Sequence, residues 1–271
     1  MQDIISLLSY SFIQRALICG IAVSFSAALI GVILVLKNYS MIGHGLGEVG
    51  FAALSLAMAL NLPALTVSIP IVIVASIIIM LISQKKGEQG DVTIALVASG
   101  ALALGVIITA FTSGFGADSY NYMFGSILAM TTSDVILSIL LTFISIGIYI
   151  IFYNRLFLIT FDEKFAKASG INVTVYQFLI ALLTAFIVVI GMRMMGTLLI
   201  SSLIVFPAII AKKTTVSFKG LVVMSGIISV ICFILGMMLS FFLSLPTGAG
   251  IVAIYLLLML VTNITTKLAK I

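Results

Sequence analysis

The segment that decides the fold is QRALICGIAVSFSAALIGVILVL, residues 14–36, in which Arg15 is the only charged residue. An α-helix needs about 20 consecutive apolar residues to cross the hydrocarbon core of a bilayer. Segments of this kind recur along the 271 residues, which are 63% hydrophobic and 8% charged, with a mean hydropathy of +1.39. A soluble domain carries about 25% charged residues. The sequence therefore predicts an all-α integral membrane protein.

Nine segments of the chain are apolar and long enough to span a bilayer. We expect them to form a compact bundle of about nine transmembrane helices, with eight as the alternative, in a single transmembrane domain over residues 1–271. Only two connections, 112–133 and 154–174, are long. The nine segments are 14–36, 41–60, 65–83, 91–111, 134–153, 175–191, 194–211, 220–243 and 247–264.

The basic residues are unevenly distributed between the two ends of these segments. Eleven of the 13 lysines and arginines lie in every second connection or after the last segment, and only Arg15 and Arg193 lie on the opposite side. Because basic residues favour the cytoplasmic side, we predict an outer N-terminus and a cytoplasmic C-terminus. The net charge of +5 then reports orientation, and we expect no nucleic-acid partner. The eleven are Lys37, Lys85, Lys86, Arg155, Lys164, Lys167, Lys212, Lys213, Lys219, Lys267 and Lys270.

The sequence lacks the short motifs of hydrolytic enzymes. It contains no GxxxxGK[ST] phosphate-binding loop, no nucleophile elbow and no HExxH zinc motif. We therefore expect that the chain is not an enzyme. Cys19 and Cys232 both lie in apolar runs, where free cysteine is typical of packing rather than of a disulfide or a metal site.

The stretch SMIGHGLGEVGF, residues 40–51, places the only histidine of the chain, His44, four residues before Glu48. On a helix these two residues share one face, about 6 Å apart along the axis. Ionisable groups inside membrane spans are costly and mark ion pathways. Imidazole and carboxylate are ligands for divalent transition metals such as zinc and manganese. A structural contact between the two side chains and a proton relay are the alternatives.

Two ligands do not complete a metal site, which usually has three or more. A two-fold dimer is one source of further ligands, because it brings a second copy of the pair toward its axis. The other source is the small set of polar residues in or near the spans, namely Ser99, Asp118, Asp134, Ser201 and Ser202.

The second long connection contains the signals of a short amphipathic helix over residues 160–170. Thr160 is the expected N-cap, and Gly170 is the expected terminator. Phe161, Phe165 and Ala168 follow one another at spacings of four and three, which gives one apolar stripe. Such a helix either rests on the lipid surface or docks into a groove of a soluble partner.

Four segments carry a family resemblance, namely DVTIALVASGALALGVII (91–108), YNYMFGSILAMTTSDV (120–135), TFDEKFAKASGINV (160–173) and LISSLIVFPAIIA (199–211). They resemble segments of the permease subunit of bacterial zinc/manganese-type ABC importers. The resemblance extends over nearly the whole chain, with the segments in the family's order. It implies a homodimer in the bacterial inner membrane that sits on two cytoplasmic ATPase subunits and receives metal from an extracellular solute-binding protein.

The resemblance also assigns roles to residues. The family carries an Asp and a His four residues apart in its second span, and with Gly43 aligned, His44 takes the Asp position and Glu48 the His position. The chain thus keeps one imidazole and one carboxylate on the same face, in the opposite order. The resemblance implies that both are metal ligands, and this combination favours zinc over manganese or iron. The expected contacts with the ATPase are Phe161, Asp162, Glu163, Phe165, Ala168 and Gly170, and those with the binding protein, in segment 112–133, include Asp118, Tyr120 and Tyr122.

On this reading the chain holds no permanent cofactor, since the metal is cargo and ATP binds the partner subunit. Two other functions remain open. One is a secondary metal transporter in which His44 and Glu48 carry protons as coupling ions, although no inverted internal repeat is visible in the sequence. The other is a membrane scaffold that recruits a soluble protein through the segment 160–170.

Overall fold

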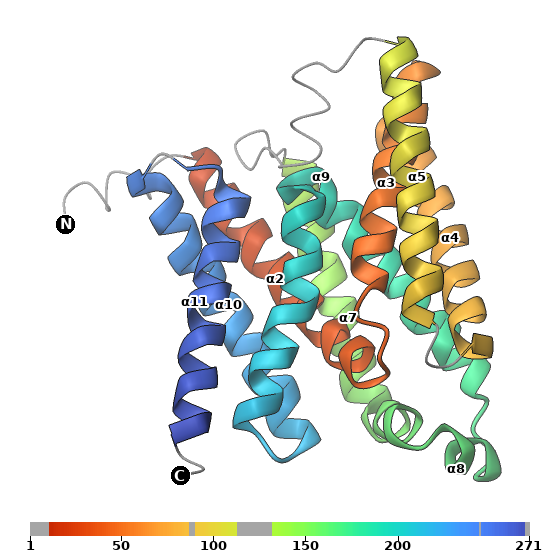
Figure 1. The fold of residues 1–271 in the computed structure, drawn as a ribbon, viewed down its shortest axis with the longest axis vertical. Coiled ribbons are helices and arrows are strands. Elements are labelled where there is room, and N and C mark those ends of the chain that lie inside the picture. Colours follow the sequence, from red (N-terminus) through yellow and green to blue (C-terminus); the bar gives the residue numbers. More distant parts are fainter. Residues whose placement is uncertain (1–10, 87–89, 113–131, 244, 269–271) are drawn as a thin grey trace.

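The computed structural model describes residues 11–86, 90–112, 132–243 and 245–268, which are helical and contain no strand (Figure 1). Short turns connect consecutive helices within these ranges. The helices are α2 (Ser11–Leu36), α3 (Ile42–Ala59), α4 (Ala64–Lys86), α5 (Gly90–Thr112), α7 (Thr132–Phe161), α8 (Glu163–Ala168), α9 (Val173–Thr214), α10 (Phe218–Leu243) and α11 (Thr247–Leu268).

The predicted membrane-spanning bundle is confirmed. Eight helical stretches of the described chain are long and apolar enough to cross a membrane, and a shorter apolar helix, Thr66–Ile82, corresponds to the predicted segment 65–83. The eight are Ile13–Leu36, Ile42–Ala59, Val92–Thr112, Val135–Phe161, Val173–Met192, Met195–Thr214, Phe218–Leu243 and Thr247–Lys267.

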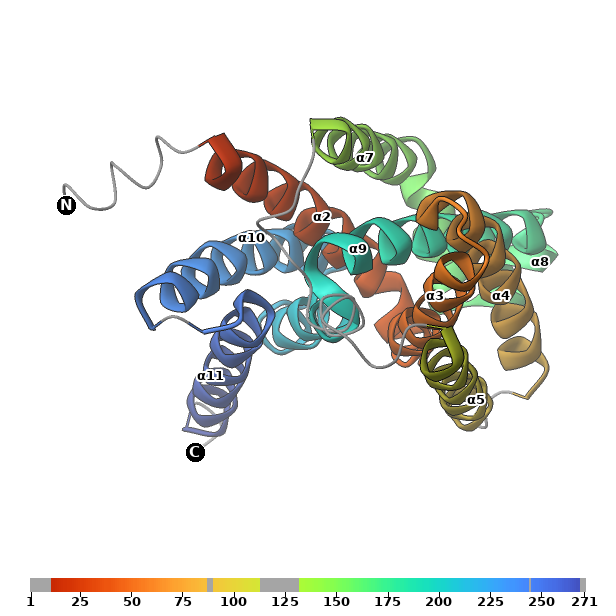
Figure 2. The same ribbon diagram turned by 90° about the horizontal axis from the view of Figure 1, so that it is seen from above.

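The helix α9 consists of two arms joined at Gly196. The backbone of Gly196 has φ 82° and ψ 164°, a conformation open to glycine and rarely to other residues. A Cβ atom added to Gly191 would lie 2.4 Å from Cδ1 of Ile200, so the arms fold against each other. Figures 1 and 2 show both arms leaving a common end in different directions. Each arm corresponds to one predicted segment, 175–191 or 194–211.

The helix α7 is longer than predicted. Residues 154–161 were expected to begin a cytoplasmic connection after the segment 134–153, but they continue the helix to Phe161. The apolar character persists through these residues, and Leu156 and Ile159 are buried. Arg155 lies within the helix, where its guanidinium donates a hydrogen bond to the hydroxyl of Tyr176 and lies over that ring, 5.9 Å from the centroid.

The helix α2 lies at the centre of the packing, in contact with α7, α9 and α10 (Figure 2). It meets the backbone of another helix at Gly31, where an added Cβ would lie 1.9 Å from the backbone oxygen of Ile204 in the second arm of α9. In a membrane, helices associate through such close packing of small residues, because lipid is as apolar as the helix surface. Cys19 and Cys232 are both buried, as expected for packing residues.

The helices α3, α4 and α5 form a group on one side of the bundle in both views (Figures 1 and 2). Helix α5 packs on α3 through Gly105, whose added Cβ would lie 2.7 Å from the Phe51 ring. The two helices also share a hydrogen bond of 3.0 Å between the hydroxyls of Thr109 and Ser55. This group contains the candidate metal pair.

The α2–α3 connection, α8, the start of α10 and the C-terminal end of α11 lie at the same end of the bundle (Figure 1). Lys37 of the α2–α3 connection pairs with Glu163 of α8 at 3.2 Å, and the ring of Phe218, at the start of α10, lies 5.4 Å from that of Phe157 near the end of α7. This arrangement agrees with the predicted order of crossings. The assignment of this end to the cytoplasm stays a prediction.

Replacing Gly31 with alanine tests the central packing. We expect Gly31→Ala to destabilise the protein by about 1–3 kcal/mol, because the new methyl group overlaps a backbone oxygen that cannot rotate away. Circular dichroism during thermal unfolding in detergent measures the loss. Gly147→Ala is the matched control, since nothing lies within 4 Å of its added Cβ. Equal melting temperatures for the two variants would contradict the packing at Gly31.

Candidate functional site

His44 and Glu48 lie on one face of α3, as the sequence predicts. The Nδ1 atom of His44 is 4.0 Å from Oε1 of Glu48. The His44 side chain is 49% exposed in the isolated chain, whereas the Glu48 side chain is 12% exposed. The histidine is therefore accessible from outside the chain, and the carboxylate lies beneath it among packed helices.

Glycines on either side fix the position of this pair. A Cβ on Gly43 would lie 2.8 Å from Cδ1 of Ile204, and one on Gly45 would lie 2.7 Å from Cγ2 of Ile94. His44 stands between them, about 100° around the helix from each. It therefore faces outward between the second arm of α9 and α5. In their own span, Ile42–Ala59, His44 is the third residue and Glu48 the seventh, and the neighbouring Gly43 packs against Ile204 of the span Met195–Thr214.

The geometry of the pair is compatible with a shared divalent metal. Two ligand atoms bound to one tetrahedral zinc at about 2.1 Å are roughly 3.4 Å apart. The observed 4.0 Å separation is too long for a hydrogen bond and closes with a small side-chain rotation. Among the described residues, no third His, Cys, Asp or Glu joins the pair. One chain thus contributes two ligands in the part that the structure describes.

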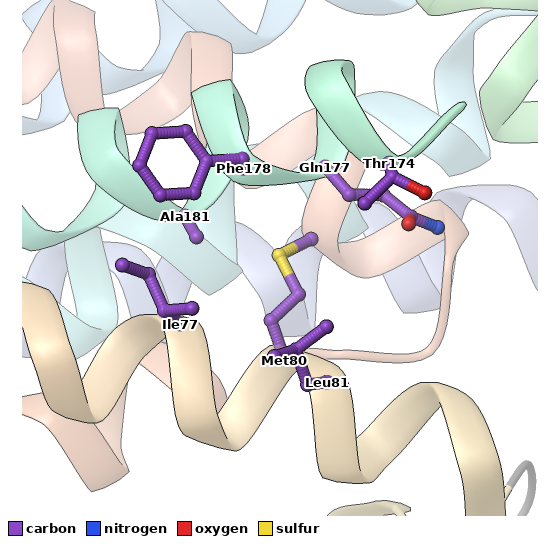
Figure 3. A pocket seen from close by; sticks show the side chains of 7 residues that line it. All are labelled: Ile77, Met80, Leu81, Thr174, Gln177, Phe178 and Ala181. Atoms are coloured by element: carbon purple, nitrogen blue, oxygen red, sulfur yellow. The ribbon is translucent and has the colours of Figure 1, made fainter. Parts of the chain in front are cut away.

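A cavity of about 140 Å³ lies between α4 and the first arm of α9, and it does not include the pair (Figure 3). Its lining is almost entirely apolar, and Gln177 and Thr174 are its polar members. The Nε2 atom of Gln177 is buried there without a hydrogen-bond partner. A site with an amide, a hydroxyl and no ionisable group is poorly suited to a divalent cation. The full lining is Ile77, Met80, Leu81, Thr174, Gln177, Phe178 and Ala181.

The predicted amphipathic helix forms, but it is shorter than expected. Thr160 is not the N-cap, because it lies in α7 and its hydroxyl donates to the Leu156 carbonyl at 2.6 Å. The cap is Asp162, whose carboxylate accepts the Phe165 N–H at 2.9 Å. Helix α8 therefore begins at Glu163 and ends at Ala168.

Gly170 terminates this segment as predicted. Its φ of 77° is left-handed, and its N–H donates to the Lys167 carbonyl at 3.1 Å. The N–H of Ile171 donates to the Ala166 carbonyl at 3.1 Å. These two bonds form the Schellman motif that commonly ends a helix at glycine.

The surface of α8 divides into an anchored side and a free side. Ala166 is fully buried, whereas Phe165 is 57% exposed and Ala168 is also exposed. Phe161, the last residue of α7, is exposed but packs edge-on against Phe218 at 6.0 Å. Phe165 is thus the large apolar side chain that α8 presents outward.

Glu163 is bound within the chain. Its Oε2 atom accepts from Lys37 at 3.2 Å, and its Oε1 atom accepts from Lys167 at 2.9 Å. Burial alone would raise the pKa of this carboxyl, but the hydrogen bonds and charges of Lys167 and Lys37 hold the pKa below its ordinary value. Burial lowers the pKa of Lys37, against the attraction of Glu163. Sequence reasoning used Lys37 only as a marker of orientation.

The predicted contacts with a binding protein, Asp118, Tyr120 and Tyr122, lie outside the described residues. The expectation for segment 112–133 therefore stays a prediction.

A bundle of helices long and apolar enough to span a membrane, with a short helix exposed between two of them, defines a polytopic membrane protein. The chain belongs to the ABC 3 transport family, whose pattern matches residues 9–266. This confirms the resemblance predicted from the sequence.

Several known proteins are similar to this chain over nearly its whole length and over nearly their own. The manganese transport system membrane protein MntC of Listeria monocytogenes is 26% identical over 248 residues, 92% of this chain and 88% of that protein. The high-affinity zinc uptake system membrane protein ZnuB of Haemophilus influenzae is 25% identical over 249 residues, 90% and 93% of the two chains. The solved structure of PsaBC from Streptococcus pneumoniae in complex with Fab matches with a TM-score of 0.84 at 26% identity, covering 96% and 94%.

The Glu163 ion pairs predict a pH-dependent stability. Glu163→Gln should lower the free energy of unfolding by about 2 kcal/mol at neutral pH, because it leaves the Lys37 charge buried without its counterion. The pKa of Glu163 is lower in the folded state than in the unfolded state. The stability that the wild type gains over Glu163→Gln is therefore fully present above the ordinary carboxyl pKa, and it is lost as the pH falls through the lowered pKa of the folded state.

Thermal unfolding of both proteins between neutral and acid pH checks this. Lys164→Gln, which removes an exposed lysine of the same helix, is the control and should melt like the wild type. A constant gap between wild type and Glu163→Gln at all pH values would contradict the ion-pair origin.

Proposed function

We propose that this chain is the membrane-spanning subunit of an ATP-driven importer that carries a divalent transition metal, with zinc as the first candidate. The observation that carries the proposal is the His44–Glu48 pair on one face of a membrane-spanning helix in a chain of the ABC 3 transport family. Ionisable groups inside a membrane span are functional-site candidates, because insertion scales put their cost at about 2.5–3.5 kcal/mol at the helix centre.

The accessibility of His44 supports a homodimer. Half of its side chain is uncovered in the isolated chain, at a depth where lipid would otherwise surround it. A second copy across a two-fold axis would supply another imidazole and carboxylate, which completes a site of four ligands. A site assembled between two subunits opens when they move apart. It therefore suits a metal in transit.

The choice of metal rests on ligand chemistry and on the relatives. Imidazole with carboxylate suits zinc, and ZnuB of H. influenzae is named as a zinc uptake protein. Manganese is the second candidate, because MntC of L. monocytogenes is named for manganese transport. Uptake of each metal in competition with the other distinguishes them.

The exposed side of α8 supports the proposed partner. Phe165 lies at the end of the bundle that carries most of the basic residues, where we place the cytoplasm and the ATPase subunits. The opposite end would receive metal from a solute-binding protein, as an importer in a bacterial inner membrane requires. Hydrolysis of ATP would then occur on the partner, and the permease would supply the pathway.

Replacing either member of the pair should abolish transport. We expect His44→Ala and Glu48→Gln each to reduce ATP-dependent uptake of zinc and manganese to background, with dimer assembly unchanged, because each removes one of two ligand types. Radiometal uptake by proteoliposomes with the co-purified ATPase measures this. Gln177→Leu is the control, since it changes a buried polar residue away from the pair.

Wild-type uptake in both site variants would show that the pair is a structural contact. Uptake by the wild type without nucleotide, abolished by collapsing a proton gradient, would instead identify a secondary transporter.

Replacing Phe165 should separate the permease from its ATPase. We expect Phe165→Ala to reduce the amount of ATPase subunit that co-purifies by about tenfold, because truncating an exposed aromatic anchor removes about 1.4 kcal/mol or more of binding energy. Phe111→Ala is the matched control, since Phe111 is 89% exposed at the opposite end. Equal co-purification of both variants would exclude α8 as the docking helix.

A further inference from the structure

Lys37 is unusual among the lysines, because only 7% of its side chain is exposed. Lysine ordinarily packs its aliphatic stem and keeps its ammonium group in solvent. Here the ammonium follows the last residue of α2 and lies 3.2 Å from Oε2 of Glu163, at the start of α8. Within the ranges that the structure describes, this ion pair alone joins two different helical regions.

Burial makes Lys37 dependent on Glu163. An ammonium group withdrawn from water has lost its hydration, and only its counterion compensates for that loss. Lys37 must therefore follow Glu163 when α8 moves. The second partner of Glu163, Lys167, is 61% exposed and belongs to α8 itself, so it is neither buried nor part of another helical region.

The connection from Lys37 to α3 is short and tightly bonded. Asn38 has a left-handed φ of 60°, and the N–H of the buried Tyr39 donates to the Leu34 carbonyl at 2.8 Å. Helix α3 begins three residues after Tyr39, and its third residue is His44. A displacement of Lys37 is therefore passed to the first turn of α3, because few torsions are free to absorb it.

We propose that the Lys37–Glu163 ion pair is the positioning contact through which a movement of α8 shifts the start of α3 and changes the geometry of His44 and Glu48. Neither Lys37 nor Glu163 touches the cargo. The inference rests on the proposed function, since it attributes the movement of α8 to the ATPase.

The arrangement of the carboxylate favours an internal role for Glu163 over a direct contact with another subunit. One oxygen accepts from Lys37 and the other from Lys167, so both are used within the chain. The docking surface and the transmitting contact then belong to different residues of the same segment. Phe165 faces outward, and Glu163 faces the bundle.

The test measures metal uptake and ATP hydrolysis together in proteoliposomes of the permease with its co-purified ATPase, using zinc and manganese salts as probes. Lys37→Met keeps the approximate shape without the charge, and Lys37→Arg keeps the charge. We expect Lys37→Met and Glu163→Gln to lower the metal transported per ATP about tenfold, with ATPase binding unchanged. Lys37→Arg and the exposed-partner control Lys167→Gln should retain the wild-type ratio.

Three results would overturn the inference. If Lys37→Met transports as much metal per ATP as the wild type, the ion pair has no role in coupling. If Lys37→Met and Lys37→Arg lower this ratio equally, with normal melting temperatures, the role of Lys37 is steric. Loss of the ATPase subunit from Glu163→Gln, but not from Lys37→Met, identifies Glu163 as a direct contact. Failure of the proposed function is distinct, because the wild-type complex itself would then transport no metal with ATP.

Discussion

Two glycines, Gly31 and Gly43, allow helices α2 and α3 to approach the same residue of α9, Ile204. An added Cβ on Gly31 of α2 would lie 1.9 Å from the Ile204 oxygen, and one on Gly43 of α3 would lie 2.8 Å from its Cδ1 atom. Helices in lipid gain little from the hydrophobic effect, so their association relies on such close approach. Because one residue of α9 touches both helices, α2, α3 and α9 converge there. The position of His44, one residue after Gly43, follows from this packing.

The transmembrane helices could be predicted from the sequence because the bilayer dictates their length and apolar character. The predictions that were wrong concern the end of α7 and the start of α8, where the bilayer no longer dictates the sequence. The stretch after Arg155 is apolar enough to extend α7, and once α7 reaches Phe161, Thr160 is inside a helix and Asp162 becomes the cap. Helical periodicity cannot choose between two adjacent capping residues, because the choice depends on where the preceding helix ends. Gly170 was predictable, since a left-handed terminator is nearly specific to glycine.

The candidate site was predictable in part for the same reason. The spacing of His44 and Glu48 places them on one face of any helix. Their surroundings were not predictable, because they depend on which residue of α9 packs against Gly43. The partner of Lys37 was equally hidden, since Glu163 is 126 residues away in the sequence and a lysine at the end of a span is ordinarily a marker of orientation.

The carboxylates of Glu163 and Glu48 differ in how completely neighbouring groups compensate their charge. Glu163 has two ammonium partners within 3.2 Å and is fully paired. Glu48 is more deeply buried, and its nearest ionisable neighbour is an imidazole 4.0 Å away that is half exposed. A buried carboxylate with so distant a partner is incompletely compensated if it is ionised. Under the proposed function, a divalent cation entering beside His44 would supply the missing charge, and a pair that does not enclose the cation would suit brief occupancy and release.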